Sequence, residues 1–530
     1  MRFGSTACGR SLVRAIVVLL SATLLLAVPI QGFNATSDPA AVNALPRFAL
    51  VIGNGRYNQV PLKNAPNDAK AIAEQLQRMG FDVTLKLDAS RSEMIETIRA
   101  FGAKLTKQKG IGLFYFAGHG AQLAWRNYLI PVDAAIKEVA QVDAQAVDLD
   151  RVLEGITRAR NPLNLVILDA CRDNPFGGDV VLQQKGLSQV DAPVGTLLAY
   201  ATAPGNTAAD GSGANGLYTE HMLKEMQTPG AKIEDIFKRV RLNVRMQSRG
   251  QQVPWESTSL EDDFYFLPPK QVRKLAPDEV ERLFDEELAL WEKIKTSTEL
   301  APLENYLRRF PSGKFSELAQ FRLDRILEKQ GEKLVQSVNS PENPFSRGTG
   351  KVNTDFAIGD RYAYRRVDTL TKAETSFTLT VTDITDEVVV YNKGTQVRDL
   401  LGNVYKSDWG DFASADGSAA QLYAAEYRVG KKWSARHKRK TPDGRTSSQE
   451  YDFKVVTKEK IQLPAGEFEA FKVEGKGFTS TGASLQFNYW VAPDKVRRVI
   501  AYDELYRGRD HRITTSQRTE LASFRQLRQP

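Results

Sequence analysis

The chain has 530 residues, too many for one hydrophobic core, and roughly 150 residues per domain suggests three or four domains. Hydrophobic residues make up 42% of the chain and charged residues 26%, which excludes global disorder, collagen and coiled coil. The formal net charge of +8 is small for this length, so it allows contact with an acidic envelope or surface but does not indicate a nucleic-acid-binding protein.

Cysteines and histidines are scarce. The cysteines, Cys8 and Cys171, cannot build a disulfide scaffold, and the four histidines are too widely spread to favour a zinc cluster. The sequence Gly53-Asn54-Gly55 could begin a dinucleotide-binding loop, but Asn58 stands where that fingerprint needs its third glycine. We therefore expect no metal and no cofactor.

Residues 1–35 have the pattern of a secretory signal peptide: early arginines, an apolar run from Ala15 to Ile30, then a small, polar stretch. The run is shorter than the roughly 20 residues of a membrane-spanning helix, although an uncleaved membrane anchor stays open as the alternative. We expect an exported protein, periplasmic or secreted, that keeps Cys171 as its one cysteine. A lone thiol in an oxidising compartment is either buried and inert or kept for its reactivity.

From residue 45 to 268 the chain alternates predicted strands and helices. Continuous apolar runs at 48–53, 111–116 and 163–168 are typical of strands buried on both faces. A capping box, Ser90 with Glu93, predicts the start of a helix between the first two runs. The alternation predicts an α/β domain with a mostly parallel sheet and helices on both faces.

Three further segments follow. Residues 274–332 are predicted to form a helical hairpin that acts as a spacer, and residues 337–350, rich in Ser, Asn, Pro and Gly, to form a linker. From 351 to 526, alternating apolar residues and turn signals predict an antiparallel β sandwich or barrel of unknown role, which could contact the envelope or a protein. The basic run Lys431 to Lys440 is expected at a solvated hairpin tip, with an anionic-surface contact as the alternative.

Two polar strand ends stand out in the α/β region. Gly118-His119-Gly120 follows the run at 111–116, and Asp169-Ala170-Cys171 follows the run at 163–168. Ligand sites of open α/β sheets lie outside the carboxyl ends of the strands, so His119 and Cys171 are expected at the same sheet edge.

That arrangement suits a thiol peptidase. His119 can take the proton of Cys171 and later give it to the leaving amine, while the amides of Gly120 and Cys171 could hold the oxyanion. Strand periodicity puts Asp169 on the same face as the thiol. Because its negative charge would not help a thiolate form, a pocket for a cationic substrate side chain is its better use.

At these residues the sequence resembles the caspase-like peptidases, more closely their metacaspase and bacterial branches than animal caspases. The resemblance covers about residues 47–267 and rests on the two strand ends and on the histidine-to-cysteine spacing. The segments at 67–70, 201–205 and 254–266 also match the family. By this resemblance His119 is the general base and Cys171 the nucleophile of a peptide-bond hydrolase.

Substrate preference follows from the same resemblance. Basic-specific relatives have aspartates at the positions of Asp169 and Asp68, whereas Asp-cleaving caspases have an arginine where this chain has Leu62. The resemblance therefore implies cleavage after Arg or Lys, although Asp68 could instead cap its helix. The sequence differs from the family pattern at two places near this pocket. Ala117 replaces the serine that many metacaspases have two residues before the histidine, and Arg172-Asp173-Asn174 replaces the His-Ser-Gly that follows the cysteine. The resemblance does not imply that calcium activates this protein.

Two other classes of function stay open. A caspase fold can lose catalysis and persist as a scaffold or binding protein, and a cell-wall amidase could share the Cys-His dyad. Turnover of peptides separates the peptidase from the scaffold. The released product separates the peptidase from the amidase, since the first releases a peptide and the second a cell-wall fragment.

Overall fold

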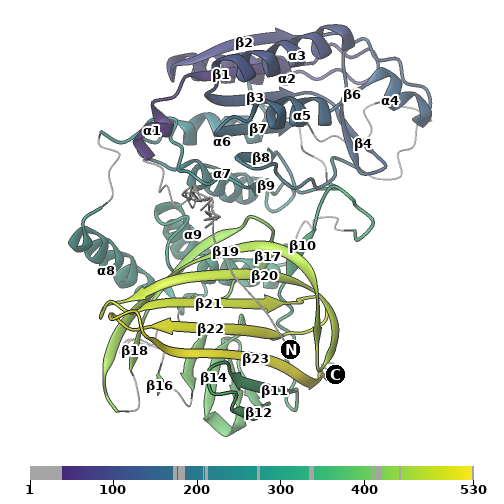
Figure 1. The fold of residues 1–530 in the computed structure, drawn as a ribbon. Helices are drawn as coiled ribbons and strands as arrows, with labels where there is room; N and C mark the ends of the chain where they lie inside the picture. The colour runs from purple at the N-terminus through teal and green to yellow at the C-terminus, as the bar shows by residue number, and fades with distance from the viewer. Residues whose placement is uncertain are drawn as a thin grey trace, which may run out of the picture. The chain divides into compact units, whose positions relative to one another are not determined.

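The computed structural model shows an α/β domain built on one sheet, with strands in the order β2-β1-β3-β7-β8-β9 (Figure 1). The structure describes residues 39–170, 176, 185–206, 208, 213–270, 275–332, 340–407, 410–411, 421–440 and 443–527. Neighbouring strands pair in parallel except β8 and β9, so the predicted mostly parallel sheet is confirmed. The strands are β1 Arg47–Gly53, β2 Phe81–Leu87, β3 Ile111–Ala117, β7 Leu163–Asp169, β8 Thr196–Tyr200 and β9 Trp255–Thr258.

Helices cover both faces of this sheet. Helix α3 packs on α5, whereas α2 packs on α6 and α6 packs on α7. Since parallel crossovers are right-handed, the reversal of direction at β2 places α2 and α3 on opposite faces. The helices are α1 Pro39–Asn43, α2 Ala65–Arg78, α3 Arg91–Gln108, α4 Val142–Gln145, α5 Asp150–Ala159, α6 Leu217–Met226 and α7 Ile233–Gln247, with a 3-10 turn η1 at Val139–Gln141.

The central strands β3 and β7 position the two polar strand ends. Every residue of both strands is buried, which explains their continuous apolar sequences. They pair in parallel from Ile111↔Leu163 to Ala117↔Asp169, without a break in register. The chain then leaves β3 through a small antiparallel sheet of β4 Gly120–Leu123, β5 Arg126–Leu129 and β6 Val147–Asp148.

The segment predicted as a helical hairpin forms three helices in its described residues, because residues 310–315 interrupt the predicted second helix: α8 Pro277–Ile294, α9 Leu300–Arg309 and α10 Ser316–Lys329. Its core includes Trp291 and Phe315, whose rings stack with centroids 5.5 Å apart. Buried Arg245 of α7 pairs with Asp324 at 2.5 Å and with Glu332 at 2.8 Å. These ion pairs join the spacer to the α/β domain.

Residues 340–350, in the segment predicted as a linker, contact the α/β domain. The Asn343 amide donates to the Gln189 carbonyl at 2.8 Å, and the Asp191 carboxylate accepts from the Arg347 N–H at 2.8 Å. The described part of this segment is thus held by specific hydrogen bonds.

The C-terminal strands close into an antiparallel barrel, the second of the two predicted forms, drawn in green and yellow in Figure 1. Its inner residues form two apolar clusters. A short pair, β10 Thr349–Lys351 with β17 Glu426–Arg428, lies outside the closed sheet. The barrel strands are β11 Arg361–Asp368, β12 Glu374–Ile384, β13 Val388–Tyr391, β14 Gln396–Asp399, β15 Val404–Ser407, β16 Gly410–Asp411, β18 Lys432–Lys440, β19 Thr446–Leu463, β20 Gly466–Thr479, β21 Ser484–Val491, β22 Ala501–Arg507 and β23 Ile513–Arg525, with a 3-10 turn η2 at Asn392–Gly394.

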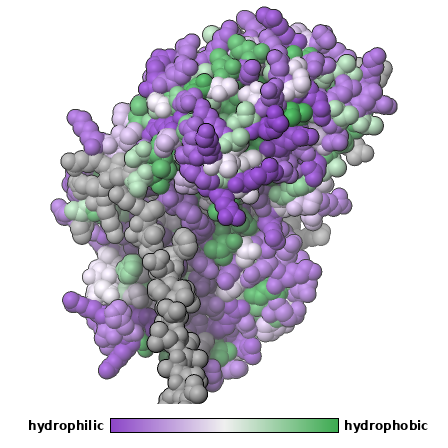
Figure 2. All heavy atoms as spheres, turned by 45° about the horizontal axis from the view of Figure 1, so that its top comes forward, coloured by the Kyte–Doolittle hydropathy of each residue, from purple (hydrophilic) through white to green (hydrophobic). Residues whose placement is uncertain are grey.

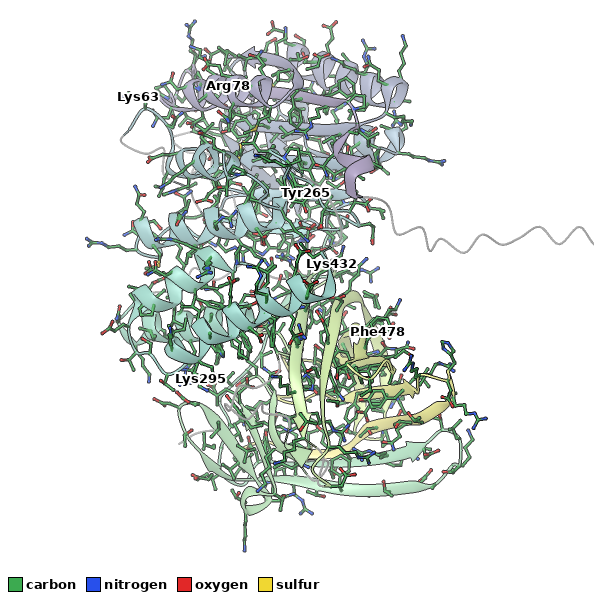
Figure 3. All side chains as sticks on the ribbon, turned by 90° about the vertical axis from the view of Figure 1, so that its left-hand side faces the viewer. Lys63, Arg78, Tyr265, Lys295, Lys432 and Phe478 are labelled. Atoms are coloured by element: carbon green, nitrogen blue, oxygen red, sulfur yellow. The ribbon has the colours of Figure 1, made fainter. Side chains whose placement is uncertain are left out.

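The basic run Lys431 to Lys440 is a strand, not the predicted hairpin tip. Strand β18 pairs along its whole length with β19. Lys432, labelled in Figure 3, donates to the Leu260 carbonyl of the α/β domain. Alternate residues of the strand are buried, so the strand has the usual period of two: Trp433, Ala435 and His437. The many basic residues between them hide this period in the sequence.

Figure 2 shows a face on which hydrophilic side chains predominate and hydrophobic ones lie in small groups. Of the helices in the described part of the chain, none has the length and apolar character that crossing a bilayer requires. The predicted signal peptide and its alternative, the membrane anchor, lie outside the described residues.

Glu256 of β9 is buried between two arginines. Its carboxylate pairs with Arg241 of α7 and, at 3.5 Å, with Arg428 of β17. Burial raises the pKa of Glu256, but the two guanidiniums outweigh burial and hold the pKa below its usual value. Glu256→Gln is therefore expected to lower the free energy of unfolding by about 3 kcal/mol, since it removes the carboxylate from between two buried cations.

Urea unfolding measures this effect. The matched control is Glu261→Gln, because the exposed Glu261 carboxylate pairs with Lys454 at the surface and its loss should change the free energy of unfolding by less than about 1 kcal/mol. Equal stability of the Glu256→Gln and wild-type chains would contradict this account of the buried triad.

His437 of β18 makes the barrel sensitive to acid. Burial and the positive charge of Arg439 lower the pKa of His437 from 6.5 to about 4, so the folded state keeps the ring neutral where the unfolded chain protonates it. Stability is therefore lost as the pH falls from 6.5 toward 4, by roughly 3 kcal/mol. His437→Leu should remove this part of the pH dependence of urea unfolding, and His511→Gln, at an exposed site, should keep it. Parallel pH profiles for wild type and His437→Leu would refute the assignment.

Candidate active site

The histidine loop lies tightly against the end of strand β7. The Gly118 N–H donates to the Asp169 carbonyl at 3.3 Å. A Cβ at Gly118 would lie 2.7 Å from the Tyr57 hydroxyl, and one at Gly120 would lie 2.6 Å from the Ala170 carbonyl oxygen. A side chain at Gly120 would force the loop away from the end of β7, and one at Gly118 would displace the Tyr57 hydroxyl. The packing therefore favours glycine at both positions.

The His119 ring is 1% exposed and is held on several sides. Its Nε2 lies 2.7 Å from the Val60 carbonyl oxygen, and the Tyr57 ring packs against it with centroids 4.4 Å apart. The Tyr57 hydroxyl accepts from the His119 N–H at 3.0 Å and donates to the Ile130 carbonyl at 3.0 Å. Tyr57 thus fixes both the ring and the backbone of the loop.

These contacts define the tautomer of His119. A carbonyl oxygen only accepts hydrogen bonds, so Nε2 carries the proton that is donated to Val60. In the neutral ring the lone pair is then on Nδ1, which is the nitrogen that can accept a proton. The arrangement equips His119 to act as a base through Nδ1.

Cys171 lies outside the described residues, as do Arg172, Asp173 and Asn174. Ala170, its neighbour in the chain, is described, and the carbonyl of Ala170 lies against Gly120. The structure therefore brings the residue before Cys171 to the histidine loop, while the nucleophile and the oxyanion donors, Cys171 and Gly120, stay predictions.

Asp169 and Asp68 are both buried, at 5% and 2% exposed, on different elements. Asp169 ends β7 and accepts from the Thr219 hydroxyl at 2.8 Å. Asp68, in the first turn of α2, accepts from the Asn215 amide at 2.8 Å and from the Gly216 N–H at 3.0 Å. The side chain of Asp68 thus reaches across to the start of α6, which is not the capping contact considered from the sequence.

Tyr115 of β3 shows that the two carboxylates share one region. Its hydroxyl lies 2.6 Å from the Thr219 hydroxyl, which also donates to Asp169. Burial raises the pKa of Tyr115 well above its usual value, and the negative charges of Asp169 and Asp68 raise it further. Both carboxylates therefore lie close enough to act on the same buried hydroxyl group.

Comparison with known proteins identifies the domain. Residues 46–265 match the family model of the caspase domain. These residues belong to the caspase-like family. The family is one of cysteine peptidases whose members act on protein substrates, and the predicted family and fold are confirmed.

The curated relatives are long proteins that this chain matches over one segment. Human mucosa-associated lymphoid tissue lymphoma translocation protein 1 is 28% identical over 204 residues, which are 37% of this chain and 23% of that protein. Its mouse homologue matches to the same extent. Among solved structures, caspase-1 from Spodoptera frugiperda is 16% identical, covers 43% of this chain and 93% of its own, and has a TM-score of 0.34.

Among the described residues, the potential metal ligands His, Cys, Asp and Glu do not gather in groups of three or more.

The residues that the sequence did not predict are the ones that hold the candidate site together: Tyr57, Val60, Tyr115, Asn215 and Thr219. No local motif marks them, because each acts through a contact with a distant part of the chain.

The role of Tyr57 is testable without touching the reacting groups. Tyr57→Phe removes the hydroxyl that bonds the His119 N–H and the Ile130 carbonyl, but keeps the ring against His119. We expect a loss of about tenfold in kcat with little change in KM, because the two hydrogen bonds that position the loop are lost. A purely structural role would instead lower the unfolding midpoint and leave kcat of the folded enzyme unchanged.

Proposed function

We propose that the caspase-like domain hydrolyses peptide bonds on the carboxyl side of arginine or lysine, with Cys171 as the nucleophile and His119 as the base. Two observations support the proposal. The His119 ring is held as the tautomer that can accept a proton at Nδ1, and Asp68 and Asp169 place two buried negative charges beside the same strand ends.

The chemical step uses the dyad twice. Nδ1 of His119 takes the thiol proton, the sulfur of Cys171 bonds to the scissile carbonyl carbon, and the C–N bond breaks as His119 gives the proton to the leaving amine. A thioester remains. Water then attacks the thioester carbon, one of its protons passes to His119, and the C–S bond breaks to restore the cysteine.

The pair of carboxylates is the observation that favours a basic substrate side chain. A guanidinium or ammonium placed near Asp169 and Asp68 would be desolvated and paired with them, which is strongly favourable only for the opposite charge. A substrate aspartate in the same place would add a third negative charge. Cleavage after Asp is therefore disfavoured.

Fluorogenic peptides that end in Arg, Lys or Asp test the proposal, with the full chain and its Cys171→Ala variant assayed side by side in reducing buffer. Cleavage after Arg and Lys that disappears in Cys171→Ala is the expected result. Cleavage after Asp alone would overturn the specificity. Turnover of none of the peptides would favour a scaffold function over a peptidase.

We further propose that the protein is exported, because of the signal-peptide pattern in residues 1–35. Fractionation of cells that express the full chain, followed by sequencing of the N-terminus, tests this. An exported protein that begins after residue 30 is expected. A cytoplasmic protein that still begins at Met1 would contradict the proposal.

A further inference from the structure

A cavity of about 240 Å³ lies within the barrel, far from the dyad in the sequence. Its walls come from strands on all sides of the closed sheet, from β11 and β12 through β18 and β19 to β21, β22 and β23. Much of the wall is aromatic. The lining includes Tyr364, Phe377, Tyr423, Tyr451, Phe487 and Tyr502.

Two guanidiniums line this cavity without a countercharge. Arg498 is 8% exposed, lies over the Tyr391 ring at 5.3 Å, and has no hydrogen-bond partner at Nε. Half-buried Arg398 donates to the Gly402 carbonyl at 3.0 Å and to the Gln396 amide oxygen at 3.3 Å, and its Nε also has no partner. Within the described part of the chain, neither arginine forms an ion pair.

The two arginines also act on each other. Burial lowers the pKa of Arg398, and the positive charge of Arg498 lowers it further. Both guanidiniums lie against Gly402, because Arg398 donates to its carbonyl and a Cβ at Gly402 would lie 3.3 Å from Nη1 of Arg498. Two cations this close in a protein interior repel unless an anion lies between them. A barrel with both Arg398 and Arg498 in its cavity wall is thus suited to bind a negatively charged group.

The remaining charges of the lining do not cancel this potential. Of the described residues that line the cavity, Arg366 and Arg439 add positive charge and Glu504 is the one carboxylate. Burial raises the pKa of Glu504, and the Tyr506 hydroxyl donates to its carboxylate at 3.0 Å. The lining therefore has an excess of arginine over carboxylate.

Several residues that line the cavity are partly exposed, among them Tyr506, Thr515 and Gln517. A small molecule could therefore enter without unfolding the barrel. Concave cavities that combine aromatic side chains with convergent polar groups are typical of small-molecule sites.

We propose that the barrel binds a small amphipathic anion, with a carboxylate or phosphate headgroup between Arg398 and Arg498 and an apolar body against the aromatic wall. A guanidinium offers a planar set of N–H donors that matches the oxygens of either headgroup. The two guanidinium groups that line the cavity supply N–H donors for these oxygens. The aromatic rings supply apolar surface for the remainder of the ligand.

Isothermal titration of the full chain with octanoate, octyl phosphate, octanol and octylamine tests the proposal. Octanoate or octyl phosphate should bind, and the tighter of the two identifies the headgroup. Octanol and octylamine should bind at least tenfold more weakly, because one lacks the charge and the other has the opposite charge. Failure of both anions to bind, or equal binding of octanol or octylamine, would overturn the proposal.

Variants locate the site. Arg498→Gln should weaken binding of the anion by about 10- to 100-fold, as expected for the loss of charged hydrogen bonds. Arg398→Gln provides a second test at a less buried position, which matters if Arg498→Gln fails to fold. Arg512→Gln, at an exposed loop where Arg512 pairs with Asp510, should bind as the wild type does. Unchanged affinity in a folded Arg398→Gln or Arg498→Gln chain would place the ligand elsewhere and refute the proposal.

Discussion

Replacing His119 by glutamine is expected to lower kcat/KM for a peptide ending in Arg by about 10³-fold, since general acid–base catalysis contributes typically 10²–10⁴-fold. Glutamine can still donate from its amide to the Val60 carbonyl, which keeps the contact made by Nε2. It has no group that accepts and returns a proton in the physiological range. The loss should therefore fall on the rate of acylation and not on the fold.

The matched control is His221→Gln. His221 lies in α6 of the same domain, and its ring bonds the Gln247 side chain at the surface, 2.7 Å away. Its replacement should leave kcat/KM within about twofold of wild type. Comparable activity of the His119→Gln and His221→Gln chains would show that His119 is not the base.

Replacing Asp169 by asparagine should change which substrate is preferred. With an Arg peptide we expect kcat/KM to fall by about 100-fold, because a buried countercharge is removed from the substrate cation. With a norleucine peptide of the same length, which has no charge to pair, kcat/KM should change little. Asparagine can still accept from the Thr219 hydroxyl, so the local hydrogen bond of the wild type is retained.

Asp82→Asn is the matched control for the charge. Asp82 has an exposed carboxylate that pairs with Lys104 at the surface. This variant should keep the ratio of Arg to norleucine hydrolysis found for the wild type. Equal losses with both peptides in Asp169→Asn would mean that Asp169 supports the strand end and does not select the substrate.

The architecture of the caspase-like domain could be predicted because its strands are buried on both faces. The continuous apolar sequences of β3 and β7 have no polar face to confuse the pattern, and the capping box at Ser90 fixes the start of α3. The barrel was predictable only as a class. Closure depends on the pairing of β11 with β23, at opposite ends of the domain, which no local pattern reveals.

The candidate site was predictable where chemistry and position coincide. His119, Asp68 and Asp169 belong to recognisable motifs, whereas their supports act across long sequence separations. Asn215 reaches Asp68 from 147 residues away, and Tyr57 reaches the His119 N–H from 62 residues away. Such pairings follow from tertiary structure alone.

The strand β18 shows how composition can mislead. Lys and Arg residues on its outer face suggested a solvated tip, but the inner positions include Ala435 and His437, which are not strongly apolar. The inner face became evident only when pairing with β19 placed those residues inside the barrel. Because these interior residues are small or polar, the sequence did not show the apolar alternation that predicts a strand.

A covalent trap can show whether Cys171 attacks substrates with a basic side chain. An acyloxymethyl ketone with an Arg residue before the reactive group would form a thioether and release the acyloxy group as a carboxylate, and intact mass spectrometry would record the adduct. We predict one adduct per chain, mapped to Cys171, formed much faster than with an Asp analogue and absent from Cys171→Ala. An adduct on another residue, or equal rates with the Arg and Asp reagents, would contradict the account.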